Sequence, residues 1–469
     1  MHNNEKFKIN IILFCFIPWL LALLFDHHPV LSFLIAYAGS YYIFYLTIWS
    51  PIKCVQSTHE VMKPLIIIQL VFAGFMCCTS IFFFADHLGY TYVTRQENYS
   101  FSITEQTYLL AKCQRMALLG HIGLVTGMIL QLKPAAGDTY NLQIPIDQFL
   151  IRWSLFVSIV AYALNYTPSF IQFKYYLLPL ATTAQALLLI RGLVYKKPFT
   201  AIYGGLLFGL HILGATLTGY KEILIIQFIM ISFLAYPYFK RTVTILFLPC
   251  LYLLLYILPT LTTIIRNESW KGNKTSESAR LEAYDTITDG RNQQLILNNN
   301  WEFLTNRLSE INMFSQYVKY TPTQQPYYGL EILNNAMLAL IPRALWSEKP
   351  MTEKVAIERV YQSRVINRLS TVSAKTRPVI DGYLSAGSMG VLASMLIYGI
   401  LVQWLCNKAQ ALFGGYELGC IVIFNGLFQQ LWRGNNWEFL INNLVYGFIL
   451  MLILFHALKL MNLLKTSRI

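Results

Sequence analysis

Apolar stretches close to the length of a bilayer crossing recur along most of the chain. Residues 11–25, 65–85 and 440–458 are examples, and none of them carries an Asp, Glu, Lys or Arg. A helix needs about 20 mainly apolar residues to cross a bilayer. The segments are apolar throughout rather than alternating, so a membrane barrel is not expected. The pattern predicts an all-α protein, a polytopic bundle of transmembrane helices.

The apolar pattern divides the chain into about twelve spans. Their expected positions are residues 9–25, 30–49, 65–85, 105–132, 149–166, 172–195, 199–217, 223–239, 243–264, 384–405, 417–432 and 440–461. One long polar interval interrupts them. We therefore expect N-terminal spans in residues 1–265, a large loop with short and membrane-dipping helices in residues 266–383, and C-terminal spans in residues 384–469.

Charge and cysteine content fit a membrane protein better than a soluble one. Only 13% of the residues are charged, and the net charge is +13. Much of the positive charge flanks the spans, where Lys and Arg set orientation, so it does not indicate nucleic-acid binding. The bias predicts cytoplasmic termini and places the long loop outside. The eight cysteines lie in or beside spans without metal-site spacing, so we expect neither a disulfide framework nor a metal.

The long loop contains a short cationic stretch between two prolines, residues 341–350. Pro342 and Pro350 bias the preceding residues away from the helical conformation, so Arg343 and Lys349 are expected in a shaped connection. Residues 331–340 before it are apolar and too short to span. A solvated loop at the membrane surface is the alternative interpretation of this stretch.

Two further segments of the loop have helical periodicity. Residues 300–311 predict a helix on which Glu302 and Glu310 share a polar stripe, with Arg307 beside it. Residues 353–368 predict an amphipathic helix. Its expected apolar side consists of Ile357, Tyr361, Val365 and Leu369. A surface helix with solvated charges is the alternative for the first segment.

Cations and carboxylates gather on the predicted outer face of the membrane. The cations on this face are Lys221, Arg343, Lys349, Arg377 and Arg433. Arginine remains charged and can contact phosphate in a bidentate manner. The loop has no Asp-x-Asp metal motif, so if a pyrophosphate group leaves at this face, side-chain cations would have to stabilise its developing charge. Asp381 is the first candidate for a general base, followed by Glu310 and Glu302.

Several motifs match those of a known family. Residues 341–350 follow Ile-Pro-Arg, two apolar residues, Trp and Lys-Pro, with Ser347 replacing a commoner Pro. Tyr328-Gly329 and Arg307 also fit, as does Arg433, whereas residues 381–387 match an acidic-x-Tyr-x-Asn-Phe-Gly motif only partly. The chain resembles the Wzy-type O-antigen and polysaccharide repeat-unit polymerases, within the GT-C-like membrane glycan polymerases and ligases.

The resemblance implies a GT-C-like fold and a glycosyltransferase of the bacterial inner membrane. It would join oligosaccharide repeat units carried on polyprenyl pyrophosphate at the periplasmic face. Its partners would be the lipid-linked donor and acceptor, membrane lipid and a chain-length regulator protein, with no nucleic acid and no cofactor. The roles implied are pyrophosphate contact for Arg343, Arg433, Lys221 and Arg377, secondary contact for Arg307 and Lys349, and general base for Asp381. Lys221 stands where many relatives have Arg.

Three other functions remain open. An O-antigen ligase or related transferase of the same fold would use similar cations, although ligases of this group often have a His in the outer loop and residues 266–383 contain none. A lipid-linked glycan flippase or transporter would place charges deep in several spans, where this chain mostly has Gln and Asn. An assembly scaffold is the third alternative.

Overall fold

The protein is described by a computed structural model. It describes residues 2–49, 60–92, 94–132, 140–217, 221–270, 278, 284–287, 289, 292–341, 346, 348–349, 351–369 and 374–466. Strands within these ranges are confined to two short antiparallel pairs, β1 (Tyr90–Thr91) with β2 (Thr94–Arg95) and β3 (Tyr140–Leu142) with β4 (Leu464–Thr466). All other regular secondary structure within these ranges is helical.

Ten helices within the described ranges are long and apolar enough to cross a membrane. The prediction of an all-α chain with many helices of membrane-spanning length and composition is confirmed. Two of the predicted spans correspond to shorter apolar helices, Ile223–Ala235 and Tyr416–Leu427.

The chain divides into two compact units. The first comprises Met1–Gly89, Glu97–Gln143 and Ser309–Ile469, and the second comprises Tyr90–Gln96 and Ile144–Leu308. The boundary at Leu308 therefore falls inside the polar interval expected as one loop at residues 266–383.

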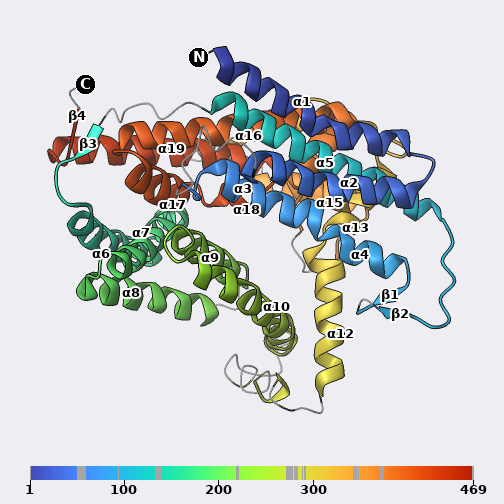
Figure 1. The fold of residues 1–469 in the computed structure, drawn as a ribbon, viewed down its shortest axis with the longest axis horizontal. Helices are drawn as coiled ribbons and strands as arrows, with labels where there is room; N and C mark the ends of the chain where they lie inside the picture. The colour runs from blue at the N-terminus through green and yellow to red at the C-terminus, as the bar shows by residue number, and fades with distance from the viewer. Residues whose placement is uncertain are drawn as a thin grey trace. The chain divides into compact units, whose positions relative to one another are not determined.

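Helix α5 (Glu105–Gln131) is the core of the first unit. It is buried along most of its length and packs against α1 (His2–Leu24), α2 (Pro29–Phe44) and α16 (Pro378–Leu412) (Figure 1). The other helices of this unit are α3 (Pro64–Ala73), α4 (Ser80–His87), α13 (Ile311–Tyr320), α14 (Glu331–Ala339), α15 (Thr352–Gln362), α17 (Asn425–Leu427), α18 (Gln430–Arg433) and α19 (Trp437–Leu460), with π-helices η1 (Tyr45–Trp49), η3 (Gly74–Cys78) and η8 (Tyr416–Phe424).

Glycines let α5 and α16 touch through their backbones. A Cβ atom on Gly127 would lie 2.2 Å from the carbonyl oxygen of Leu396, and one on Gly399 would lie 2.1 Å from that of Leu124. Small residues permit such approach between helices in a membrane, where van der Waals packing is a main source of association. Of the loop helices of this unit, α13 packs on this pair, whereas α14 packs mainly against α19.

The second unit is a helical bundle in which a buried carboxylate joins neighbouring helices. Asp147 near the start of α6 accepts hydrogen bonds from Arg191 at 2.7 Å and Lys197 at 2.5 Å. Its helices are α6 (Ile146–Ala163), α7 (Lys174–Val194), α8 (Pro198–Leu217), α9 (Lys221–Ala235), α10 (Lys240–Trp270) and α12 (Gln293–Phe303), with 3-10 helices η4 (Leu164–Tyr166) and η5 (Pro168–Phe173) and the π-helix η7 (Leu304–Leu308).

Helix α16 is a hairpin and not one straight helix. Its backbone leaves the helical region at Ala386 and Gly387. A Cβ atom on Gly382 would lie 2.6 Å from the carbonyl oxygen of Gly390, although residues eight apart on a straight helix are separated by about 12 Å along its axis. The first two turns of α16 therefore fold back on the long remainder.

The break in α16 frees carbonyl groups that a neighbouring loop uses. The backbone N–H of Tyr328 donates to Leu384 at 2.9 Å, and that of Gly329 donates to Ser385 at 3.0 Å. Helix ends leave such carbonyls without an intrahelical partner. The two sequence motifs at Tyr328-Gly329 and at residues 381–387 are thus joined directly, backbone to backbone.

Two helix predictions in the loop were wrong in detail. The helix expected at residues 300–311 is interrupted: α12 passes into η7, and α13 starts only at Ile311, with Glu310 as its N-cap. The helix expected at residues 353–368 ends at Gln362, so Val365 and Leu369 lie beyond it and Leu369 is 90% exposed. Within the helix, Arg359 is buried at 3% exposure, whereas Ile357 and Tyr361 are half-buried.

Replacing Gly387 by Ala should destabilise the hairpin. Gly387 has φ +60° and ψ −140°, and an added Cβ atom would lie 3.0 Å from the Tyr327 hydroxyl. A side chain in this nearly glycine-only region costs about 1–3 kcal/mol. Thermal unfolding in detergent should show a lower melting temperature for Gly387→Ala. Gly209→Ala is the control, because a Cβ atom there meets nothing within 4 Å. If Gly387→Ala melts at the same temperature as the wild type, the hairpin is contradicted.

Candidate functional site

Three fully buried charged side chains meet where α15, α16 and α19 come together. The Arg359 guanidinium donates to both carboxylate oxygens of Glu438, at 2.5 and 3.0 Å, and to Asp381 Oδ1 at 3.1 Å. Arg359 is 3% exposed, and the two acids are 0% exposed. We call Arg359, Asp381 and Glu438 the buried triad. Two carboxylates thus share one guanidinium.

The electrostatics of the triad keep Arg359 charged. Burial alone lowers the pKa of its guanidinium, but Asp381 and Glu438 outweigh burial and raise this pKa above its usual value. Breaking a buried ion pair by removing one partner is strongly destabilising, because an uncompensated charge stays behind. The triad therefore couples three segments of the chain that are distant in sequence.

Asp381 also caps the N-terminus of α19. Its Oδ2 atom accepts the backbone N–H of Trp437 at 2.9 Å, and Trp437 is the first residue of the helix. Carboxylates at a helix N-terminus satisfy free N–H groups and are favoured by the helix dipole. The indole of Trp437 donates to Ser394 at 2.7 Å, and Ser394 donates to the Pro378 carbonyl. Both oxygens of Asp381 are consequently engaged.

A second ion pair lies one helical turn from the triad. Arg377, the N-cap of α16, bonds Glu310 Oε1 through Nε at 3.1 Å and Nη2 at 3.0 Å. Its Nη1 atom donates to the Gly434 carbonyl at 2.8 Å. Gly434 directly follows Arg433 in the chain. Tyr317 lies near both acids: burial raises the pKa of its hydroxyl, and Asp381 and Glu310 raise it further.

Comparison with known proteins gives a family and no function. The sequence matches a family described as a domain of unknown function, DUF8712, over residues 17–466. The chain belongs to the DUF8712 family. No curated protein and no solved structure matches it.

In this DUF8712 protein, Glu310 and Arg377 are paired directly, and Arg377 also donates to the carbonyl of Gly434, the residue after Arg433. Asp381 lies one turn after Arg377, and its backbone N–H donates to the Arg377 carbonyl at 2.8 Å. Lys349 is also in the first unit, where its ammonium group donates to the carbonyls of Ala339 at 2.6 Å and Ile341 at 2.8 Å.

The other predicted residues belong to the second unit or lie outside the described residues. Arg307 and Glu302 are exposed residues of the second unit, and Lys221 is the first residue of α9 in that unit. Arg343 lies outside the described residues. Of the predicted cations within the described residues, Arg377 contacts the carboxylate of Glu310, and it also reaches the backbone carbonyl of the residue after Arg433.

Sequence reasoning missed Arg359 and Glu438. Arg359 shares the buried side of α15 with Ala356, Val360 and Ser363, a spacing of i, i+3, i+4 and i+7. Small residues at this spacing on both sides of an arginine are the sequence signal that could have indicated a buried Arg359. Glu438 had a weaker signal, since it stands in the first turn of a helix where acids are commonly exposed.

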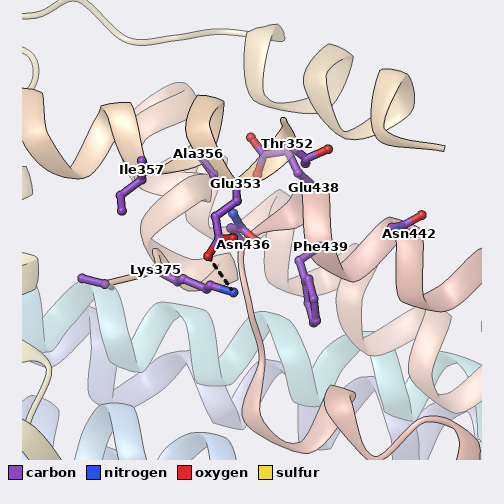
Figure 2. Close-up of a pocket in the computed structure, with 10 residues that line it drawn as sticks. Thr352, Glu353, Ala356, Ile357, Lys375, Asn436, Glu438, Phe439 and Asn442 are labelled. Atoms are coloured by element: carbon purple, nitrogen blue, oxygen red, sulfur yellow. Dashed lines mark ion pairs between the residues drawn. The ribbon is translucent and has the colours of Figure 1, made fainter. Parts of the chain in front are cut away.

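A pocket of about 170 Å³ opens beside the triad (Figure 2). Glu438, Asn436, Phe439 and Asn442 line it from α19 and the residue before it. Its other lining residues are Thr352, Glu353, Ala356 and Ile357 of α15, and Ala374 and Lys375. Figure 2 shows Lys375 and Glu353 facing one another, with their charged groups 3.7 Å apart.

No group of three or more His, Cys, Asp or Glu side chains placed to hold a metal ion occurs in the described part of the chain. Between Asp381 and Glu438, the position that a cation would take is filled by the guanidinium of Arg359.

Removing the charge of Arg359 should destabilise the protein far more than removing an exposed arginine. Arg359→Met leaves two buried carboxylates without their cation, at a cost of about 3–5 kcal/mol. We expect a much lower melting temperature, or loss of monodisperse protein, by size-exclusion chromatography and thermal unfolding in detergent. Arg368→Ala is the matched control, since Arg368 is 63% exposed and pairs with Glu358 at the surface. If Arg359→Met and Arg368→Ala had the same melting temperature and were equally monodisperse, the triad would be ruled out.

Proposed function

We propose that this DUF8712 protein is a membrane glycosyltransferase that joins oligosaccharide units carried on polyprenyl pyrophosphate, as a polymerase of surface polysaccharide. The observation that carries the proposal is the ion pair of Arg377 with Glu310, which lies one helical turn from Asp381 and touches the backbone beside Arg433. These residues come from three separate segments, and they lie at the ends of helices in a strongly apolar protein. The family resemblance of the motifs at residues 341–350 and 381–387 supports the same function.

In the proposed reaction, cations and a carboxylate have separate roles. The bond between the sugar C1 and the pyrophosphate oxygen breaks, and an acceptor hydroxyl oxygen forms the new bond to C1. Arg433 and Arg377 would stabilise the negative charge that develops on the departing lipid pyrophosphate. A carboxylate would accept the proton of the attacking hydroxyl. Lys221, Arg307, Arg343 and Lys349 remain predicted additional contacts for the pyrophosphate.

Among the three predicted acids, Glu310 has the most suitable geometry for the base. Its Oε1 atom is held by Arg377, while the buried Oε2 atom has no hydrogen-bond partner among the described residues. Both oxygens of Asp381 already accept hydrogen bonds, so we assign Asp381 to positioning α19 and Arg359. Glu302 belongs to the second unit.

The fold and the location follow from the same proposal. We propose a GT-C-like arrangement in a bacterial inner membrane, with both termini in the cytoplasm and the site on the periplasmic side. A ligase of the same fold would transfer the glycan to a different acceptor, and a flippase would move the lipid without joining glycans. The arginine and carboxylate pair outside the long spans favours transfer chemistry over transport.

Purified protein in liposomes with polyprenyl-pyrophosphate-linked oligosaccharide should form polymer, seen as a ladder on gels. Arg433→Ala should reduce the rate by roughly 10²-fold or more, as for loss of a charge-stabilising group. Glu310→Gln should reduce it by about 10²–10⁴-fold, as for loss of a general base. The control Arg368→Ala should retain the wild-type rate. Lipid translocation without polymer, or full activity of Arg433→Ala, would contradict the proposal.

A further inference from the structure

Helix α14 exposes an apolar side that no described residue of the protein covers. Its opposite side is buried, with Ile332 at 2% and Ala336 at 0% exposure. The exposed side consists mainly of large apolar side chains that are 36% to 70% exposed, and we call them the α14 face: Leu330, Leu333, Met337, Leu338 and Ile341. Neighbouring apolar side chains that are exposed together mark a surface that contacts another molecule or a membrane.

The buried side of α14 rests on a helix that is long and apolar enough to span a membrane. Helix α14 packs mainly against α19, and α19 is one of the ten candidate spans. The exposed residues of α19 include Val445, Ile449 and Ile453, which recur every four residues and therefore share one side of the helix. In a bilayer, that side of α19 contacts acyl chains. Helix α14 is thus attached directly to a span, although it belongs to the polar loop.

The start of α14 lies beside one end of another span. The backbone N–H groups just before α14 bind carbonyls at the turn of the α16 hairpin. In the same hairpin, the centre of the Tyr383 ring lies 5.8 Å from the Lys112 ammonium of α5. The part of α5 from Lys112 to Gln131 has about the 20 residues that are needed to cross a bilayer. The hairpin therefore fixes the start of α14 near the level at which α5 would enter the apolar core of the membrane.

The C-terminal end of α14 is closed by a side chain of the protein. The last carbonyls of a helix have no intrahelical partner, and acyl chains offer no hydrogen-bond donor to replace water. The Lys349 ammonium donates to the carbonyls of Ala339 at 2.6 Å and of Ile341 at 2.8 Å. A cation at this end is also favoured by the helix dipole. Helix α14 can therefore end against lipid without leaving these two carbonyls unpaired.

From the exposed face, the attachment to α19 and the closed end, we propose that α14 lies in the membrane interface, with the α14 face docked on the acyl chains of the surrounding lipid. An interfacial helix buries its apolar side about 5–10 Å into the boundary between headgroups and acyl chains, and its polar side chains point to water. The exposed polar residues of α14 are Glu331 and Asn334, both among its first four residues. A soluble partner protein fits this face less well, because lipid is the medium that surrounds a span. The docking does not depend on the proposed glycosyltransferase activity.

Spin-label EPR on the full-length protein in liposomes of phosphatidylethanolamine and phosphatidylglycerol tests the docking without an activity assay. Leu333→Cys and Met337→Cys would each carry a nitroxide label, and the unsubstituted protein, taken through the same labelling, gives the background from the native cysteines. Oxygen concentrates among acyl chains, whereas a polar nickel chelate stays in water. At both positions, collisions of the label with oxygen should exceed those with the nickel chelate by roughly threefold or more, as for side chains below the headgroups.

Two further labelled variants serve as controls. Arg368→Cys should collide mainly with the nickel chelate, because Arg368 is 63% exposed and pairs with Glu358 at the surface. Ile449→Cys, on the exposed side of α19, should collide mainly with oxygen. Leu330→Cys replaces either test variant if that variant does not fold.

Two results would overturn the docking. Labels at positions 333 and 337 that collide mainly with the nickel chelate would show that the α14 face is in water. Labels that neither reagent reaches would show that a partner protein or a second copy of this chain covers the face. A protein that forms no polymer, but whose labels collide mainly with oxygen, keeps the docking and loses the proposed function.

Discussion

The contact between Arg359 and two buried carboxylates is the interaction on which the rest of the first unit depends. Arg359 comes from the loop helix α15, Asp381 from the short arm of the α16 hairpin, and Glu438 from the first turn of α19. Buried charges are expensive unless paired, so each segment requires the other two. This requirement ties a polar loop to apolar helices that could otherwise pack without it.

The triad explains why the neighbouring groups have their geometry. Asp381 is held by Arg359 on one oxygen and caps α19 with the other, which sets where α19 begins. The hairpin that carries Asp381 needs Gly387, and the carbonyls freed at its turn bind the backbone at Tyr328 and Gly329. Arg377 then lies one turn before Asp381, where it reaches Glu310 and the carbonyl next to Arg433. Charge pairing and backbone geometry thus build the candidate site together.

Apolar run length was enough to predict the helical membrane class, because a bilayer crossing has a fixed minimum length. It could not reveal the hairpin, since Pro378–Leu412 is apolar on both sides of a turn that only backbone angles define. Periodicity predicted the wrong extent and the wrong buried side for α15, because the helix ends at Gln362 and the charged Arg359 occupies a buried position on it. Motifs identified Asp381, Arg377 and Arg433, but pairing partners such as Glu438 depend on three-dimensional contacts that no local pattern encodes.

A double-mutant cycle between Arg359 and Glu438 tests the central claim most directly. Arg359→Met, Glu438→Met and the double variant would be compared with the wild type by thermal unfolding in the same detergent. If the pair is coupled as described, the double variant is more stable than the sum of the single effects by roughly 0.5–3 kcal/mol. Strictly additive effects would show that the two side chains do not interact and would contradict the account.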